Sequence, residues 1–171
     1  MTHKTLKITL YNNWVVLYFL IFILIGFIII LIYLNFQSDF LFIFTILFLI
    51  QAIPAMYLYL EYWFQNKNEK YEIYADKLIK YKKNKKEQFD IEDIEQVIIF
   101  MSPSLYQNWY IHFFAIEQYH FARIYLKNGK KLIITCLLAS RVDKALLNLK
   151  GIKIEKKKWL FNSIYTPESW Y

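Results

Sequence analysis

Two long apolar runs occupy the first third of the chain. Between Trp14 and Leu34 there is no charged residue, and between Phe40 and Leu60 the only strongly polar side chain is Gln51. At about 1.5 Å per residue, a helix over either run covers roughly 30 Å, the thickness of the hydrocarbon core of a bilayer. We therefore predict two transmembrane helices, at about residues 14–34 and 40–62, which form an antiparallel hairpin because the connection between them is so short.

The second run contains one pair of unusual residues, Gln51 and Pro54, within a single helical turn. The proline removes a backbone donor, and the amide of Gln51 could satisfy the freed carbonyl or bond across to the first helix. Substrate and proton pathways usually need charged groups at mid-depth, and neither run has one. We interpret the pair as a helix-packing device.

The positions of the lysines predict the orientation of the hairpin. Lys4 and Lys7 precede the first run, and Lys67 and Lys70 follow the second, whereas residues 35–39 between the runs contain no Lys or Arg. Cytoplasmic loops are enriched in these residues. Both termini are therefore expected in the cytoplasm, with the protein in the cytoplasmic (inner) membrane of a bacterium.

After Phe64 the pattern changes to short segments in which apolar and polar residues alternate, as in strands. Such segments are found around residues 71–73, 78–81, 89–91 and 94–100. Further along, the pair Asn128-Gly129 joins the apolar runs 124–126 and 132–138 and favours a tight hairpin turn. We predict about six or seven short strands in this part of the chain.

One amphipathic helix is expected after the last strand. Ser140 can cap its N-terminus, with Asp143 three residues later, and Gly151 can end it. Apolar residues recur between them at helical spacing, at Val142, Leu146 and Leu149. The predicted fold class is an α+β membrane protein: a two-helix transmembrane hairpin followed by an antiparallel β-barrel or sandwich capped by a C-terminal helix.

Composition divides the chain into three parts. The protein is 57% hydrophobic, above the roughly 45–50% of globular proteins, and the excess lies in residues 1–64, the N-terminal arm and hairpin. Residues 65–155 form the expected cytoplasmic domain, and residues 156–171 form a basic and aromatic tail. These two parts hold all but two of the 21 basic and all but two of the 14 acidic residues.

The order of these elements resembles a known family. The hairpin is followed by YEIYADKLIKYKK, FDIEDIEQVIIF, IYLKNGKKLIITCLL and the helix SRVDKALLNL. Together they look like the bacterial pleckstrin-homology-like (PH-like) domain membrane proteins that carry an N-terminal transmembrane hairpin. The resemblance covers about residues 14–154. It implies a small split β-barrel capped by a helix, no catalysis, and binding at the membrane. Some relatives are associated with self-protection against bacteriocins or with cell-envelope stress.

Few residues offer catalytic chemistry. His112 and His120 are not spaced as metal ligands, and Cys136 is the only cysteine, so a zinc site lacks ligands. Neither a nucleophile motif nor a glycine-rich phosphate loop is present. We predict no catalytic residue, no metal and no cofactor, and we expect that the protein is not an enzyme.

Two basic clusters are candidate sites for anionic lipid, since a lysine close to an anionic leaflet contributes about 1 kcal/mol to binding. The first lies in a predicted hairpin and consists of Lys82, Lys83, Lys85 and Lys86. Acidic residues follow it at once, so it is equally well explained by pairing across the hairpin. The second consists of Lys156, Lys157, Lys158 and Trp159, where basic and aromatic residues follow one another without acids as far as Phe161, which favours membrane contact. Nucleic acid is disfavoured because no recognition helix stands out.

An aromatic block lies between Tyr106 and Phe121. If it forms a strand, Phe113 and Phe114 point to opposite faces, and both faces need cover. The barrel core can take one face, and the other could rest on the hairpin, the lipid surface or another protein chain, unless the whole block is internal core. The candidate partner-binding residues are Tyr106, Trp109, Tyr110 and Phe114.

These patterns predict a non-enzymatic, membrane-anchored binding or scaffold protein. Its PH-like domain is expected to engage a protein partner or anionic lipid headgroups at the cytoplasmic face of the membrane, and it could act as a homo-oligomer. The alternative is an immunity or envelope-defence protein that protects against a membrane-active toxin or bacteriocin.

Overall fold

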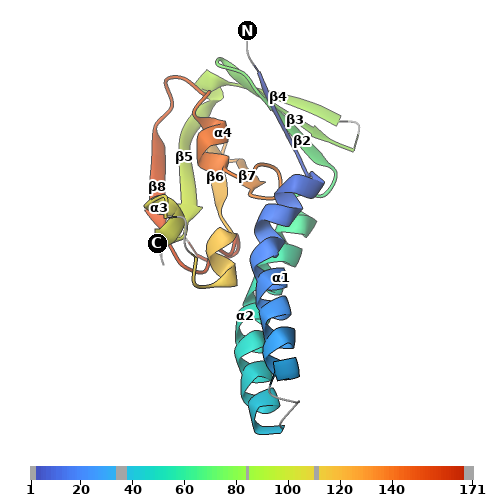
Figure 1. The fold of residues 1–171 in the computed structure, drawn as a ribbon. Helices are drawn as coiled ribbons and strands as arrows, with labels where there is room; N and C mark the ends of the chain where they lie inside the picture. The colour runs from blue at the N-terminus through green and yellow to red at the C-terminus, as the bar shows by residue number, and fades with distance from the viewer. Residues whose placement is uncertain (1–2, 34–37, 84, 110–111, 168–171) are drawn as a thin grey trace.

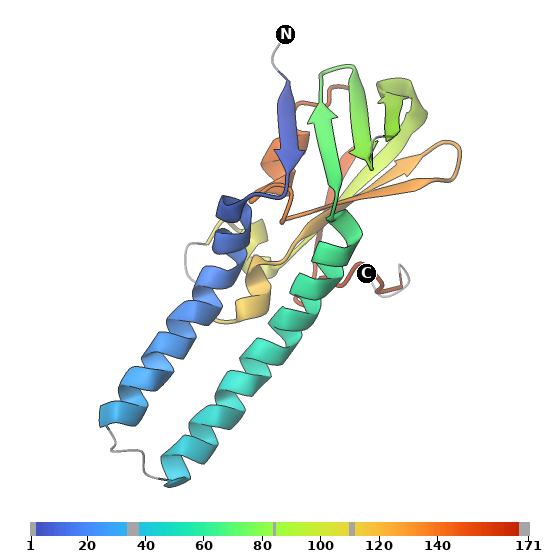
Figure 2. The ribbon, with the colours of Figure 1, turned by 90° about the vertical axis from the view of Figure 1, so that its right-hand side faces the viewer.

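The structure is a computed structural model that describes residues 3–33, 38–83, 85–109 and 112–167. Two long helices, α1 (Leu10–Tyr33) and α2 (Ser38–Asn66), lie side by side and extend from a head that contains all the strands (Figures 1 and 2). The head consists of two four-stranded sheets and short helices. The protein is therefore of the α+β class.

The first sheet contains a strand from before the helices. Its strands are β1 (Lys4–Lys7), β2 (Glu69–Ile73), β3 (Lys77–Lys82) and β4 (Lys85–Asp90), in the order β1-β2-β3-β4, all antiparallel. Lys4 pairs with Ile73 and Lys7 with Lys70. The helical pair is thus inserted between two neighbouring strands of one sheet. In the sequence-based division, β1 falls within residues 1–64, the arm and hairpin.

The second sheet is mixed. Its strands are β5 (Ile94–Met101), β6 (Phe121–Leu126), β7 (Lys131–Thr135) and β8 (Ile154–Lys158), in the order β7-β6-β5-β8. Strand β8 pairs with β5 in parallel, so the prediction of purely antiparallel strands is wrong for this pair. The reason is the crossover after β7, which returns the chain across the sheet so that β8 runs in the same direction as β5. The predicted hairpin between β6 and β7 is confirmed, and Gly129 has a φ of 80° in its turn.

Between β7 and β8 lies the helix α4 (Val142–Leu146), with Arg141 as its N-cap. The predictions of a Ser140 cap and of a helix that continues to Leu149 are therefore wrong. Asp143 does not complete a capping box because its carboxylate binds the side chains of Arg141 and of a lysine in β8. The helix is short because the chain turns after Leu146.

The aromatic block forms no strand in its described part before β6. It contains the end of helix α3 (Pro103–Tyr106) and the 3-10 helix η2 (Ala115–Gln118), while another 3-10 helix, η1 (Ile91–Asp93), precedes β5. The strand interpretation is wrong because the backbone of η2 bonds locally: Glu117 N–H donates to the Phe114 carbonyl and Tyr119 N–H to the Ile116 carbonyl.

The hydrophobic core has two parts. The first lies between the sheets and α4 and includes Tyr71, Val97, Ile124 and Leu146. The second joins the upper part of the helical pair to the second sheet and includes Val16, Leu58, Tyr62, Phe121 and Leu137. The head and the adjoining ends of α1 and α2 are therefore packed as one body.

Two buried asparagines fix the helices to the head. At the end of α2, the Asn66 amide donates to the Ile133 carbonyl at 2.9 Å and accepts from Thr135 N–H at 3.0 Å. Near the start of α1, the Asn12 amide donates to the Leu137 carbonyl at 3.1 Å, and Thr9 caps the helix by accepting from the Asn12 backbone N–H. Helix α2 is thus tied to β7 and helix α1 to the segment that follows β7, by hydrogen bonds that the sequence pattern did not reveal.

Among the described residues, one helical segment, Leu41–Asn66 of α2, is by itself long and apolar enough to cross a membrane. Helix α1 passes the same test only if its two bent parts, Leu10–Tyr18 and Leu20–Tyr33, are counted together. The pair of transmembrane spans remains a prediction.

Candidate functional site

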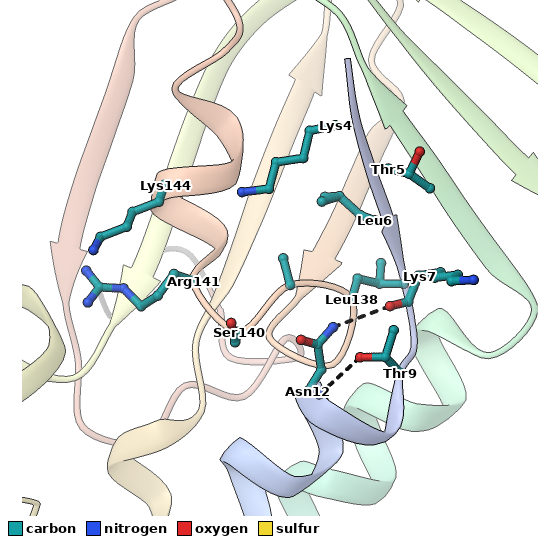
Figure 3. A pocket seen from close by; sticks show the side chains of 11 residues that line it. Lys4, Thr5, Leu6, Lys7, Thr9, Asn12, Leu138, Ser140, Arg141 and Lys144 are labelled. Atoms are coloured by element: carbon teal, nitrogen blue, oxygen red, sulfur yellow. Dashed lines mark hydrogen bonds between the residues drawn. The ribbon is translucent and has the colours of Figure 1, made fainter. Parts of the chain in front are cut away.

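A pocket of about 620 Å³ opens between β1 and the segment that leads into α4 (Figure 3). One wall is formed by β1 and the first turn of α1, and the other by the loop 138–141 and α4. The polar and charged residues that line the pocket include Lys4, Lys7, Asn12, Ser140, Arg141 and Lys144. The pocket therefore brings residues 4–12 together with residues 138–144, from distant parts of the chain.

Asn12 holds the two walls of this pocket together. Its amide Nδ2 donates both to the Lys7 carbonyl at 3.3 Å and to the Leu137 carbonyl at 3.1 Å. The side chain is buried, and a buried amide that loses such partners costs about 1–3 kcal/mol. The spacing of the walls is therefore fixed by the fold itself.

The pocket is positively charged. Lys4, Lys7, Arg141 and Lys144 line it, and none of its described lining residues is acidic. Lys4 points across the opening toward α4, while the side chain of Lys7 points to the other side of β1 (Figure 3). Ser140 adds a hydroxyl to the wall. Lys144 and Arg141 point away from β1, so Lys4 is the cationic side chain that reaches across the opening (Figure 3). An ammonium group in a concave surface that also carries a hydroxyl suits a phosphate or carboxylate group.

The Arg141 side chain is held in one orientation by Asp143. Its guanidinium makes two bonds of 2.9 Å to the Asp143 carboxylate and one of 2.9 Å to the Asn108 side chain. Burial acts to raise the pKa of Asp143, but the bonds from Arg141 and Lys156 hold this pKa well below its usual range. The carboxylate thus stays ionised and partly neutralises Arg141, so the positive charge of the pocket comes mainly from Lys4 and Lys144.

The three lysines of the second predicted lipid cluster lie in strand β8, and their side chains have different surroundings. Lys156 bonds to Asp143 at 3.0 Å, Lys157 is half-buried, and the Lys158 ammonium lies 4.4 Å from the centre of the Tyr106 ring. Trp159 follows, half-buried, and its backbone N–H donates to the Met101 carbonyl. Since neighbouring residues of a strand point to opposite faces, these lysines form no single basic surface.

The first predicted cluster lies at the β3–β4 hairpin. Lys82 and Lys80 both bond to the buried Glu69 carboxylate, at 2.9 and 2.8 Å. Burial acts to raise the pKa of Glu69, but these two lysines lower it. Lys83, Lys85 and Lys86 are exposed to solvent. Lys82 is thus engaged within the protein, although its partner is Glu69 rather than an acidic residue across the hairpin.

The predicted partner-binding aromatics lie on the surface of the head. Trp109 is 56% exposed and Phe114 is 45% exposed, and Tyr106 is exposed beside Lys158. Tyr110 lies outside the described residues. Phe113 is not among the predicted partner-binding residues, but it is 67% exposed. The C-terminal end of this block belongs to the hydrophobic core, since Tyr119 and Phe121 are fully buried.

Cys136 and His120, two residues whose side chains could take part in catalysis, are buried. Among the described residues there is no group of three or more His, Cys, Asp and Glu that could hold a metal ion. Burial raises the pKa of the Cys136 thiol to about 12, so the thiol is not a nucleophile at neutral pH. His120 is enclosed between the Gln118 carbonyl and the Val142 N–H.

Comparison with known proteins gives one match. A family model described as a PH domain matches residues 2–145. The matched region begins before β1 and ends within α4, so it includes both helices as well as both walls of the basic pocket. The comparisons with curated proteins and with solved structures found no match.

Proposed function

The chain belongs to the PH domain family, whose general role is in binding or as a scaffold, and from this we propose that it is a non-enzymatic binding protein held at a membrane by α1 and α2. In this proposal the head lies on the cytoplasmic face of the cytoplasmic membrane. There it engages a protein partner or an anionic lipid headgroup.

The exposure of α2 is the observation that carries this proposal. Only 11% of the apolar stretch within Leu41–Asn66 is buried, whereas the core helix of a soluble protein would be mostly covered. Large side chains such as Phe42 and Ile50 face outward. Transfer of apolar surface from water is favourable by about 25 cal/mol per Å², so this surface needs a lipid environment or a partner. Lipid is the simpler cover for a surface that extends along two adjacent helices.

The distribution of lysines along the chain supports a cytoplasmic location of the head. Lys4, Lys7, Lys67 and Lys70 lie at the head end of the helices, and the sequence between α1 and α2 contains no Lys or Arg. By the positive-inside rule, the head end faces the cytoplasm.

We expect reporters fused before Met1 and after Tyr171 to read as cytoplasmic, and a reporter inserted at Gln37 to read as external. An alkaline carbonate wash should leave the protein in the membrane fraction, because the helices are held by hydrocarbon rather than by surface charge. A soluble protein after the wash, or an external reading at either terminus, would contradict the proposal.

The basic pocket supports an anionic ligand. We expect the double variant Lys4→Gln/Lys144→Gln to bind short-chain phosphatidylglycerol about 30-fold more weakly than the parent protein, since each lysine contributes about 1 kcal/mol. The matched control is Lys127→Gln/Lys130→Gln, which removes two exposed lysines at the β6–β7 turn. Binding is measured by titration of the detergent-solubilised full chain.

Short-chain phosphatidylcholine serves as the uncharged comparison in this titration. If both double variants bind phosphatidylglycerol as the parent does, the pocket is not the headgroup site, and the proposal reduces to a protein partner.

A further inference from the structure

One loop of the head reaches far down the helical pair. We define the aromatic loop as residues 112–118, which include Phe113, Phe114 and η2. The Ala115 N–H donates to the Gln51 side chain on α2 at 3.1 Å, and the Gln118 amide donates to the Tyr18 hydroxyl on α1 at 3.3 Å. The loop therefore lies at the level of Gln51 and Tyr18, lower than the sheets (Figures 1 and 2).

These contacts change the interpretation of Gln51. The sequence suggested that its amide completes the hydrogen bonding of the helices, whereas its oxygen accepts a backbone hydrogen bond from the head. A polar side chain in the middle of an apolar helix is here the attachment point of a loop. The head consequently covers the upper part of α2, where Ala55 and Leu58 are fully buried.

The length of helix below the aromatic loop is too short for a bilayer. Residues 19–33 of α1 and 38–50 of α2 extend past the loop by about 20 Å, at roughly 1.5 Å per residue. The hydrocarbon core is about 30 Å thick. A bilayer that covers these segments must therefore extend about 10 Å further toward the head. At that height Ile53 and Met56 of α2 still expose apolar surface.

The surface of the loop is suited to lipid. Phe113 and Phe114 project from it with 67% and 45% of their surface exposed. Three of its backbone donors have partners: Phe113 N–H donates to the Glu117 carboxylate at 2.8 Å, Ala115 N–H to the Gln51 side chain at 3.1 Å, and Glu117 N–H to the Phe114 carbonyl at 3.0 Å. Backbone groups that are already bonded can approach hydrocarbon without the usual cost of several kcal/mol.

We propose that the aromatic loop enters the cytoplasmic leaflet, with Phe113 and Phe114 at the boundary between headgroups and acyl chains. The inference rests on the proposed membrane anchoring and adds a second membrane contact, which is continuous with the exposed apolar faces of α1 and α2. The head then lies on the membrane and does not stand off from it. The occupant of this surface is the bilayer rather than a second protein.

The test uses three positions with the same exposed fraction in the structure, 67%: Phe113 in the loop, Phe42 in α2 and Leu147 beside α4. Each is replaced by cysteine in a Cys136→Ala background and labelled with an environment-sensitive fluorophore. The full chain is reconstituted in vesicles of phosphatidylcholine and phosphatidylglycerol. Lipids brominated at shallow or deep acyl positions then report contact by quenching.

We expect the label at Phe113 to be quenched more by shallow bromines than by deep ones, the label at Phe42 to be quenched by deep bromines, and the label at Leu147 to be unaffected. Quenching at Phe42 with none at Phe113 overturns the inference but leaves the membrane anchor intact. No quenching at Phe42 overturns the anchor itself. A blue shift at Phe113 without quenching assigns the loop to a protein contact, including a second copy of this chain, and also overturns the inference.

Discussion

Leu146→Ala is expected to lower the free energy of unfolding of the head by about 2–5 kcal/mol, whereas Leu147→Ala changes it by less than about 0.5 kcal/mol. The two leucines are neighbours at the end of α4, but Leu146 is fully buried and Leu147 is 67% exposed. Leu146 belongs to the core between the two sheets. Its truncation removes apolar contacts and leaves a cavity, while truncation at Leu147 removes surface that water already reaches.

Thermal unfolding of the detergent-solubilised full chain, followed by tryptophan fluorescence, measures this difference. Because the variants delete the same atoms from adjacent positions, effects on expression, detergent binding and helix propensity are nearly matched. Equal melting temperatures for the two variants would show that α4 does not cover the core as described.

The second large effect is a loss of stability in mild acid caused by His120. Burial lowers the pKa of this imidazole to about 4, although the hydrogen bond to the Gln118 carbonyl acts in the opposite direction. The Val142 N–H donates to Nε2 at 3.2 Å, so this nitrogen must carry a lone pair and the ring must be neutral. A protonated ring would place two donors face to face.

The folded pKa of His120 lies below the ordinary value of 6.5, so the unfolded chain binds the proton more readily. Its contribution to stability is therefore complete above about pH 6.5 and is lost as the pH falls toward 4. The difference amounts to about 3 kcal/mol at the acid end. His112 acts in the same sense, because burial lowers its pKa despite the nearby Glu117.

We expect His120→Gln to remove most of this pH dependence between pH 6.5 and 4.5, because glutamine can offer an acceptor to the Val142 N–H and has no titrating group. His112→Gln should remove a smaller part, since that side chain is less deeply buried. The measurement is the melting temperature of each variant as a function of pH. Asp143 and Glu69, whose pKa values are lowered, destabilise the head only at lower pH, below their ordinary values of 3.8 and 4.5. A parent protein with a flat profile over this range would contradict the role of His120.

The sequence was sufficient for the elements whose signals are local. Strands β2 to β5 follow from alternation, and the β6–β7 turn follows from Asn128-Gly129, because such patterns depend only on neighbouring residues. Strand β8 was missed because it is stabilised by its parallel pairing with the distant β5. Its run of lysines is also typical of a solvated tail, so no local pattern marks it as a strand.

The basic pocket could not be predicted because its walls come from opposite ends of the PH domain. In the sequence, Lys4 indicates only the orientation of the helices, and no local pattern marks Lys144 as part of a site. Their proximity depends on the pairing of β1 with β2 and on the hydrogen bonds of Asn12. In the same way, the attachment of the aromatic loop to Gln51 joins residues that no periodicity relates.

The position of β1 before the helices has a consequence for biosynthesis. Leu6 of β1 is buried in the core of the head, yet the strand that pairs with β1 is synthesised only after both α1 and α2. In a cell where α1 and α2 cross the membrane, both must be inserted and returned before the first sheet can close. If the first helix inserts in the wrong direction, β1 remains on the opposite side of the membrane from the rest of the head. The first sheet then lacks its edge strand. Completion of the first sheet therefore depends on correct insertion of both helices.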